Sequence, residues 1–263
     1  MIKRWIVTGD THGNVRARLK NIQSNLNIDN PEEYGIIILG DAGINYTLDE
    51  GEAAWKKRIN AMGFKIYCVR GNHEERPENI STMEKWFDND AHWFVWREAK
   101  YPNIRYLWDG HLYHFGDYSA VVIGGAYSVD KHWRLERGAK WFKDEQLTAK
   151  EMATITHNLE YTQCNFVLSH TCPISWQPRD LFLSSVDQSK VDNTMETWLE
   201  EIKNKFSWHI WLFGHYHDDR LVRPRVEMFF NDYEFLDEVA KRWDSAEELP
   251  WWMKKDPNYY MED

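Results

Sequence analysis

The chain has 263 residues, and its 42 acidic against 32 basic side chains give a formal net charge of −10 at pH 7. This balance argues against a general surface for long nucleic acids, because such surfaces depend on clustered Lys and Arg. A content of 43% hydrophobic and 15% aromatic residues excludes an intrinsically disordered chain. The length suits one large α/β domain, with or without an appendage.

The cysteines and the apolar runs bear on where the protein works. Cys68, Cys164 and Cys172 have no paired spacing, so they indicate neither a disulfide framework nor a thiolate metal site. The first apolar stretch meets Asp10 too early for a secretory leader, and no apolar run approaches the roughly 18 residues that span a bilayer. We therefore expect a cytoplasmic protein that does not associate with membranes.

In the first third of the chain, short β-branched runs alternate with segments of helical period. Strands are predicted at 5–7, 36–39 and 64–69, and helices at 15–26 and about 50–62. Each predicted strand runs into a polar turn. This alternation indicates a layered α/β fold, in which ligands bind beyond the carboxyl ends of the strands.

The middle section predicts antiparallel strands. Residues 105–108 and 111–115, with a turn at Asp109-Gly110, resemble a hairpin, and 120–123 is a further strand. The remaining predicted elements are strands at 166–168 and 210–213, a helix at about 193–206, and a strand region at 220–230 in which Pro224 indicates an edge or a bulge.

The end of the sequence differs in composition, so we expect one domain over residues 1–231 and an extension over 232–263. The extension holds ten acidic and four basic residues together with Trp243, Trp251 and Trp252. One interpretation is a short helix and aromatic anchor packed back on the domain. The other is a contact for a partner or for oligomer formation, because clustered exposed aromatic residues are common at interfaces.

Polar side chains of the types that bind metals follow directly after the predicted strands, where residues from several strands converge. Carboxylate, imidazole and amide-oxygen ligands suit Mn, Fe, Zn, Co or Ni. Seven such residues exceed what one ion takes from protein, whereas two ions sharing a carboxylate would use them all. Such a pair activates a water and stabilises both oxygens of an in-line displacement at phosphorus. The seven candidates are Asp10, His12, Asp41, Asn72, His170, His215 and His217.

These residues fall in five sequence blocks that occur in the order of a known superfamily. The blocks are Gly9-Asp10-x-His12, Gly40-Asp41, Gly71-Asn72-His73-Glu74, the later His170, and Gly214-His215-x-His217. Together they resemble the calcineurin-like metallophosphoesterase superfamily, in particular its compact stand-alone members from bacteria and phages. The resemblance implies an α/β fold with a two-sheet β-sandwich flanked by helices and a di-metal centre at the sheet ends.

The resemblance also implies how the ligands divide between two ions. One metal would take Asp10, His12, Asp41 and His217, and the other Asp41, Asn72, His170 and His215, so that Asp41 is the bridge. Manganese is the first expectation for both positions, with Fe, Zn, Ni or Co as alternatives.

Three further residues receive catalytic roles by the same resemblance. His73 would donate a proton to the leaving group or stabilise the transition state, and Glu74 could orient its ring. Arg70, directly before the Gly-Asn-His block, could contact the phosphoryl oxygens.

The second block departs from the pattern of many members, because Ile44 replaces the second Asp of Gly-Asp-x-x-Asp. This leaves the first phosphate contact unidentified. The segment 127–131, with Arg134 and Arg137 nearby, could supply a substitute, and an exposed loop of solvated charges is an equal alternative.

The sequence therefore predicts a metal-dependent phosphoric ester hydrolase, a phosphatase or a phosphodiesterase, that attacks phosphorus with a metal-bridging hydroxide and forms no covalent intermediate. The expected partner is a small phosphorylated substrate, a nucleotide or a phosphopeptide; long nucleic acid is disfavoured by the acidity, and oligomerisation stays open. The alternative is a non-catalytic metal-binding interaction scaffold of the same fold.

Overall fold

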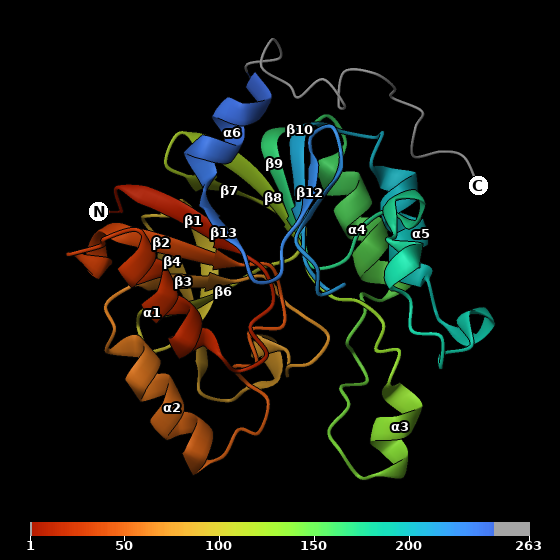
Figure 1. Ribbon diagram of the computed structural model, residues 1–263, viewed down its shortest axis with the longest axis horizontal. Coiled ribbons are helices and arrows are strands. Elements are labelled where there is room, and N and C mark those ends of the chain that lie inside the picture. The colour runs from red at the N-terminus through yellow and green to blue at the C-terminus, as the bar shows by residue number, and fades with distance from the viewer. Residues whose placement is uncertain (1, 245–263) are drawn as a thin grey trace.

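The computed structural model describes residues 2–244, and two β-sheets packed face to face form its centre (Figure 1). The first sheet has the strand order β13-β1-β2-β3-β6-β5-β4, with parallel pairing from β1 to β6 and antiparallel pairing at its two ends. Its strands are β1 Arg4–Thr8, β2 Tyr34–Ile38, β3 Lys65–Cys68, β4 Met83–Asp88, β5 Trp93–Glu98, β6 Ile104–Leu107 and β13 Tyr233–Phe235.

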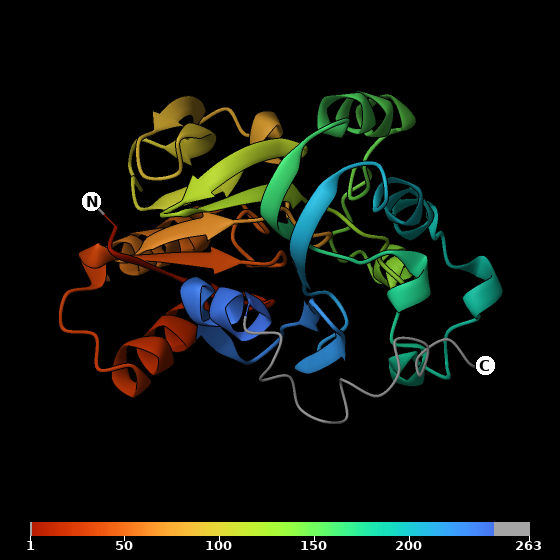
Figure 2. The same ribbon diagram turned by 90° about the horizontal axis from the view of Figure 1, so that it is seen from above.

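The second sheet has the order β11-β12-β10-β9-β8-β7, in which β12, β10, β9 and β8 are parallel neighbours. Seen from above, the two sheets lie as adjacent layers with helices on their outer sides (Figure 2). The strands of this sheet are β7 His111–Phe115, β8 Tyr118–Ile123, β9 Gln163–Ser169, β10 Ser207–Phe213, β11 Arg220–Arg223 and β12 Val226–Met228.

Helices cover the outer face of each sheet. In Figure 1, α1 and α2 lie beside the first sheet, α4 and α5 lie beside the second, and α6 caps one rim. The helices are α1 Val15–Asn25, α2 Glu50–Asn60, α3 Lys131–Glu136, α4 Ala149–Leu159, α5 Thr194–Ile202 and α6 Leu236–Asp244. The protein is thus an α/β sandwich of two mixed sheets flanked by helices, as the sequence predicts.

Successive strand residues point to opposite faces, and this alternation builds three apolar layers. Val7 and Ile37 lie between the sheets, in one cluster with Phe166 and Leu212 of the second sheet. Their neighbours in sequence, such as Ile6, face outward against α1 and α2. An equivalent cluster joins the second sheet to α4 and α5. Both faces of the central strands are therefore buried, which explains their nearly continuous apolar sequences.

The predicted hairpin over 105–108 and 111–115 is wrong. Strand β6 pairs with β3 and β5 in the first sheet, whereas β7 pairs with β8 in the second. Asp109-Gly110 is the point where the chain passes from one sheet to the other. Both strands contribute side chains to the core between the sheets, so their alternating pattern does not reveal which strand each one pairs with.

The sequence analysis also missed the antiparallel pair β4–β5 at the edge of the first sheet. Its outward side chains include Trp86, Phe87 and Phe94, which are all exposed. Apolar residues on both faces hide the alternation by which strands are normally detected. Pro224 lies in the turn between β11, an edge strand, and β12.

The first part of the 232–263 extension continues the fold. Strand β13 pairs with β1, and α6 buries Leu236, Val239 and Trp243 in the cluster between the sheets. Trp251 and Trp252, and with them the expected partner contact of the tail, lie outside the described residues.

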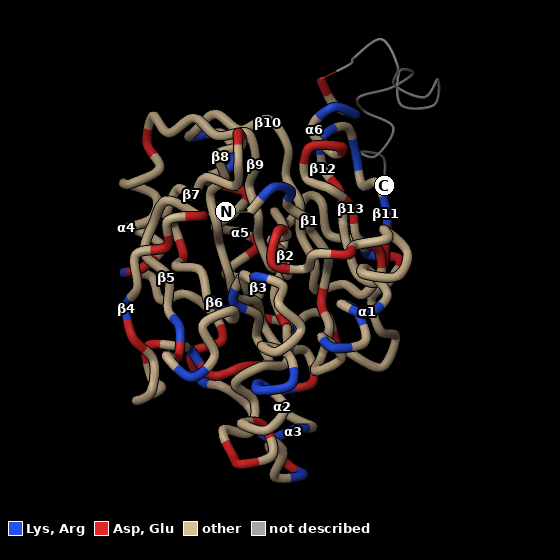
Figure 3. The backbone as a smooth tube through the Cα atoms, turned by 90° about the vertical axis from the view of Figure 1, so that its left-hand side faces the viewer, with Lys and Arg blue, Asp and Glu red and all other residues tan. Residues whose placement is uncertain are grey.

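Charged residues of both signs are interspersed along the backbone of the first sheet, α1 and α2 (Figure 3). Within residues 2–244, no helix is long and apolar enough to cross a bilayer.

Candidate metal centre

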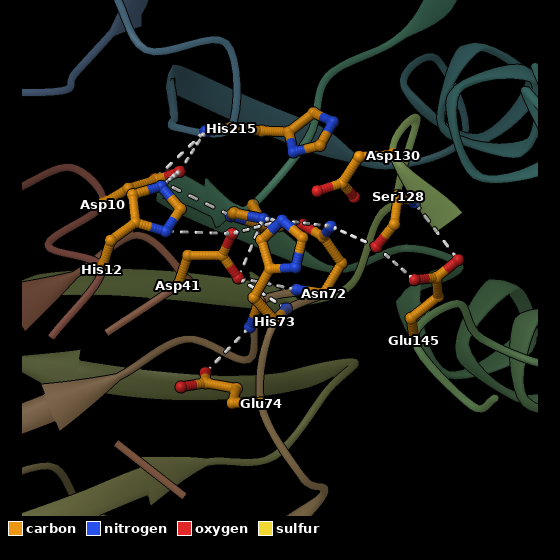
Figure 4. Close-up of polar contacts among 12 residues, drawn as sticks. Asp10, His12, Asp41, Asn72, His73, Glu74, Ser128, Asp130, Glu145 and His215 are labelled. Carbon is orange, nitrogen blue, oxygen red and sulfur yellow. Dashed lines mark hydrogen bonds and ion pairs between the residues drawn. The ribbon is translucent and has the colours of Figure 1, made fainter. Parts of the chain in front are cut away.

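The seven predicted ligands meet at one end of the sandwich. Asp10 and His12 follow β1, Asp41 follows β2, and Asn72 follows β3, while His170 follows β9 and the remaining two histidines follow β10. These strands are parallel within each sheet, so their carboxyl ends lie on the same edge. Figure 4 shows Asp10, His12, Asp41 and Asn72 converging there.

Asp10 is the centre of the first group of ligands. Its Oδ2 lies 3.6 Å from Nε2 of His217 and 3.8 Å from Nε2 of His12. Ligand atoms of these three residues all lie within 4.8 Å of one another. The backbone N–H of His215 donates to both oxygens of Asp10, at 3.1 and 3.2 Å, and so orients the buried carboxylate.

Asp41 lies between the two groups and turns one oxygen to each. Its Oδ2 is 3.9 Å from Nδ1 of His12, whereas its Oδ1 is 3.7 Å from Nε2 of His170. The backbone N–H groups of Asn72 and His73 both donate to Oδ1 at 2.9 Å. This arrangement is the one expected of a carboxylate shared between two ions.

The contact between His170 and Asn72 is the strongest indication of a cation. The ring of His170 is fully buried, and its Nδ1–H donates to the carbonyl oxygen of Leu39 at 2.8 Å, which leaves Nε2 as an acceptor. Asn72 donates through Nδ2 to Ser128 Oγ at 2.9 Å, so its Oδ1 is an acceptor as well. These two acceptors lie 2.8 Å apart. Neighbouring ligands of one ion, each roughly 2.1 Å from it, lie about 3.0–3.4 Å apart.

The charges and pKa shifts of the cluster also favour a bound cation. Burial lowers the pKa of His170 and holds that of His215 well below its ordinary value, so both rings are neutral at pH 7. Burial and the charge of Asp41 raise the pKa of Asp10 well above its ordinary value. Burial also opposes ionisation of Asp41, but the positive charge that the surrounding imidazoles carry when protonated, that of His170 first, brings its pKa below the ordinary value. The Asp41 carboxylate is thus stabilised by positive charge close to it, and a divalent cation would supply that charge when the imidazoles are neutral.

The ring of His215 occupies a different position from the other ligands. It packs against the ring of His170 with centroids 4.9 Å apart and against Tyr216 at the same distance. In Figure 4 the ring points away from Asp10. The structure thus gathers four of the other five predicted ligand residues around the carboxylates of Asp10 and Asp41, and it places the fifth, His215, beside His170.

The backbone at the site has the unusual conformations that often accompany function. His12, Asp41, His215 and His217 all have positive φ, between 42° and 70°. Such residues are uncommon outside glycine and cluster at functional sites. Gly71 has a different role, because a Cβ there would lie 2.0 Å from Oδ1 of Asp41. The glycine of the Gly-Asn-His block therefore permits the close approach of two strand ends.

His73 lies at the edge of the cluster. Its Nε2 is 3.9 Å from Oδ2 of Asp41 and 3.4 Å from Nδ2 of Asn72, and its side chain is 20% exposed. The structure does not bring Glu74 to this ring. Instead, Oε1 of Glu74 accepts the N–H of Gly71 at 3.0 Å, and burial raises the pKa of this carboxyl to about 8. Glu74 therefore stabilises the turn that carries the ligand, rather than the imidazole.

Arg70 does not reach the cluster either. Its Nε donates to Asp109 Oδ2 at 2.9 Å, and its other two nitrogens donate to the carbonyl oxygens of Glu145 and Gly124 at 2.8 and 3.1 Å. The guanidinium is buried and its three nitrogens are all engaged. The expected phosphoryl contact does not fit this arrangement, in which Arg70 connects three segments of the fold.

Sequence reasoning missed two residues that orient Asn72. The hydroxyl of Ser128, which accepts from the Asn72 amide, itself donates to the buried carboxylate of Glu145 (Figure 4). Glu145 also accepts from the N–H of Ser128 at 3.2 Å and from Nε1 of Trp141 at 2.9 Å. The segment 127–131 therefore reaches the site, but Ser128 supports a ligand there. The polar character of the segment pointed to the site without revealing this role.

Two cavities border the cluster, and His73 lines both. One has a volume of about 560 Å³ and is also lined by His12 and Arg134. The other has a volume of about 480 Å³ and is also lined by Asp41, Asn72, His215 and His217. A larger hollow of about 1360 Å³ lies between α4 and α5, and none of the predicted site residues lines it. The chemistry of the side chains, rather than cavity size, therefore locates the site.

Fold and cluster together define a two-sheet α/β protein with a candidate metal centre at its strand ends. The sequence profile of the family described as calcineurin-like phosphoesterase matches residues 3–219. The chain therefore belongs to the calcineurin-like phosphoesterase family, whose members are metal-dependent phosphoesterases.

Two solved structures align with most of this chain at low sequence identity. Phosphopantetheinyl hydrolase (PptH) from Mycobacterium tuberculosis aligns with a TM-score of 0.43 and 15% identity over 97% of both chains. TT1561 of Thermus thermophilus aligns with a TM-score of 0.43 and 10% identity, over 89% of this chain and 98% of its own. A comparison with curated protein sequences gave no significant match.

Proposed function

We propose that the protein is a di-metal-dependent phosphoesterase that hydrolyses a small phosphomonoester or phosphodiester. The observation that carries this proposal is the pair of opposed acceptors, His170 Nε2 and Asn72 Oδ1, beside a carboxylate that faces both groups of ligands. When bound, two divalent cations supply positive charge at the phosphoryl oxygens and activate a water for in-line attack at phosphorus. Manganese is the first candidate.

The ligands divide between the ions as the blocks suggest. Asp10, His12 and His217 would hold one ion, and Asn72 and His170, with His215 beside them, would hold the other. Asp41 would contribute to both.

His73 is the residue that we assign to the leaving group. It lines both cavities, and its Nε2 lies 3.9 Å from Oδ2 of Asp41. The phosphorus–oxygen bond to the alcohol breaks as the oxygen of water bonds to phosphorus. The departing alkoxide takes a proton from protonated His73, and the proton that the attacking water gives up restores the imidazolium. The products are the alcohol and a phosphate, or a phosphomonoester when the substrate is a diester.

The reaction needs no covalent intermediate on the protein. Cys172 is the cysteine nearest to the ligands in sequence, but it is fully buried, and burial raises the pKa of its thiol well above the ordinary value. A thiol that stays protonated is a poor nucleophile. The Ser128 hydroxyl is also buried and donates to Glu145.

Hydrolysis of p-nitrophenyl phosphate and bis-p-nitrophenyl phosphate tests the proposal. Metal-stripped protein is resupplied in turn with Mn, Ni, Co, Zn and Mg, and metal content is measured alongside turnover. We expect metal-dependent hydrolysis that is lost in Asp41→Asn, with a larger loss than for His217→Ala, because only Asp41 faces both groups of ligands. The ratio between the two esters separates phosphatase from phosphodiesterase. Two bound ions without turnover of either ester would favour the scaffold alternative.

A further inference from the structure

The cavity of about 480 Å³ beside the cluster, which we call the alcohol cavity, has a mixed lining. Asp41, Asn72, His73, His215 and His217 of the predicted site contribute to it. Apolar and aromatic side chains from segments far apart in the chain form another part of the lining, which we call the apolar wall. Its members are Tyr127, Val129, Leu181, Phe182, Leu183, Val186, Val191 and Tyr216. Uncharged polar groups are added by Ser128, Gln177, Gln188 and Asn193.

The centre of the apolar wall is a stacked aromatic pair. The rings of Phe182 and Tyr216 have centroids 6.4 Å apart and an interplanar angle of 20°. Phe182 is half-buried, and the neighbouring Leu183, which also lines the cavity, is 59% exposed. Apolar side chains that protein packing leaves partly uncovered beside a polar centre suit an apolar portion of a ligand.

The charges in the alcohol cavity favour the same kind of ligand. None of the described residues that line it is Lys or Arg, whereas Asp130, Asp192 and Glu196 contribute carboxylates. Asp130 is paired with Arg134 at 2.8 Å, and Arg134 lines the other cavity. Glu196 is buried, and its Oε2 has no hydrogen-bond partner among the described residues. An anionic group entering here would lose water next to carboxylates without gaining a counter-charge.

We propose that the alcohol cavity binds the alcohol part of the substrate and selects esters whose alcohol is uncharged and largely apolar. The inference rests on the proposed function, because it takes the phosphoryl group to lie at the cluster. The alcohol part is assigned to this cavity because five of the predicted site residues line it. Of the predicted site residues, only His12 and His73 line the cavity of about 560 Å³. His73, shared by both, is then adjacent to the leaving oxygen.

Two esters that differ only at the end of the alcohol test the selection. Hexyl phosphate and 6-(phosphonooxy)hexanoic acid both release an unbranched six-carbon primary alcohol, but the second alcohol carries a terminal carboxylate. With manganese-loaded protein and release of inorganic phosphate as the readout, we expect kcat/KM to be at least tenfold higher for hexyl phosphate. Equal values, or a preference for the carboxylate, would overturn the proposal.

A variant of the aromatic wall tests where the alcohol lies. Phe182→Ala is expected to lower kcat/KM several-fold more for hexyl phosphate than for methyl phosphate, through a higher KM, because methanol is too short to reach the wall. Leu135→Ala is the matched control, since Leu135 is 53% exposed on α3 and does not line the cavity. An equal effect of Phe182→Ala on both esters, or no effect on either, would contradict the assignment.

Calorimetric binding of non-hydrolysable phosphonates separates this inference from the proposed function. We expect hexylphosphonate to bind manganese-loaded protein at least tenfold more tightly than methylphosphonate, and Phe182→Ala to remove most of the difference. If this difference is found but no ester is turned over, the proposed function fails and the binding assignment stands. If esters are hydrolysed but the two phosphonates bind equally, the proposed function stands and the alcohol cavity does not.

Discussion

Removal of the Ser128 hydroxyl tests whether the orientation of Asn72 controls the second metal position. In Ser128→Ala, Nδ2 of Asn72 loses its acceptor at 2.9 Å, and the nearest alternative recorded for it is Nε2 of His73 at 3.4 Å. The amide is then free to rotate, so that Oδ1 no longer faces Nε2 of His170. Partners that orient a metal ligand typically contribute 10–100-fold in metal affinity or activity, which corresponds to about 1.4–2.7 kcal/mol.

The fold should tolerate this change. Glu145 loses one hydrogen bond but keeps those from the N–H of residue 128 and from Trp141 Nε1, at 3.2 and 2.9 Å. The free energy of unfolding should therefore fall by about 1–3 kcal/mol, which a folded domain of this size survives. Urea unfolding of the metal-free variant measures this cost separately from the loss of metal.

Calorimetric titration of metal-free protein with Mn²⁺ is the assay, followed by kcat/KM for p-nitrophenyl phosphate. We expect one of the two ions to bind 10–100-fold more weakly in Ser128→Ala, with Ser128→Thr recovering part of the affinity because it keeps a hydroxyl. Ser119→Ala is the control, since the Ser119 hydroxyl donates to Asn165 at 3.0 Å, away from the site. Unchanged affinity for both ions in Ser128→Ala would refute the reasoning.

Three other substitutions give independent checks. His73→Ala should keep both ions and slow hydrolysis most for aryl phosphates with poor leaving groups, and loss of metal or uniform slowing across the series would contradict its role. Arg70→Ala should lower the free energy of unfolding by about 3–5 kcal/mol in urea titrations, because it leaves Asp109 and two carbonyl groups without their partner, and unchanged stability would argue against a structural role. Burial raises the pKa of Glu196 to about 7 in the folded protein, from an ordinary value of 4.5. The stability that this shift contributes is full below pH 4.5 and is lost as the pH rises through 7. The free energy of unfolding should therefore fall between pH 5 and pH 8, and this fall should be smaller by about 3 kcal/mol in Glu196→Gln than in the wild-type protein. Equal falls in the two proteins would contradict the shift.

The sequence predicts the ligands well because their constraint is local. Each ligand follows a buried strand, and a run such as Ile36–Leu39 marks both the strand and its end. Parallel pairing of such strands then brings their ends together without further information. Convergence of Asp10, Asp41 and His170 within 4.8 Å needs in addition the packing of the two sheets, because β9, which His170 follows, lies in the second sheet.

The predictions from the sequence fail where one residue pattern is compatible with more than one pairing strand or contact. Residues 105–115 alternate as two strands should, but alternation does not state which strands pair. The motif around Arg70 likewise specifies an arginine two residues before Asn72 without stating which groups it contacts. Asp109, Gly124 and Glu145, which it contacts, are distant in sequence, so only the folded chain reveals them.

Arg70 and Ser128 both act on the segment that contains Glu145, which leads to a final prediction. Arg70 holds the backbone carbonyl of Glu145, and the carboxylate of Glu145 holds Ser128, which in turn orients Asn72. The arginine before the Gly-Asn-His block thus supports, through the segment 124–145, a ligand two residues further along the chain. If the connection is physical, Arg70→Lys and Ser128→Ala should not be additive in their effect on Mn²⁺ affinity, with a coupling of about 0.5–3 kcal/mol in the double-mutant cycle. Additive effects would show that Arg70 stabilises the fold independently of the metal centre.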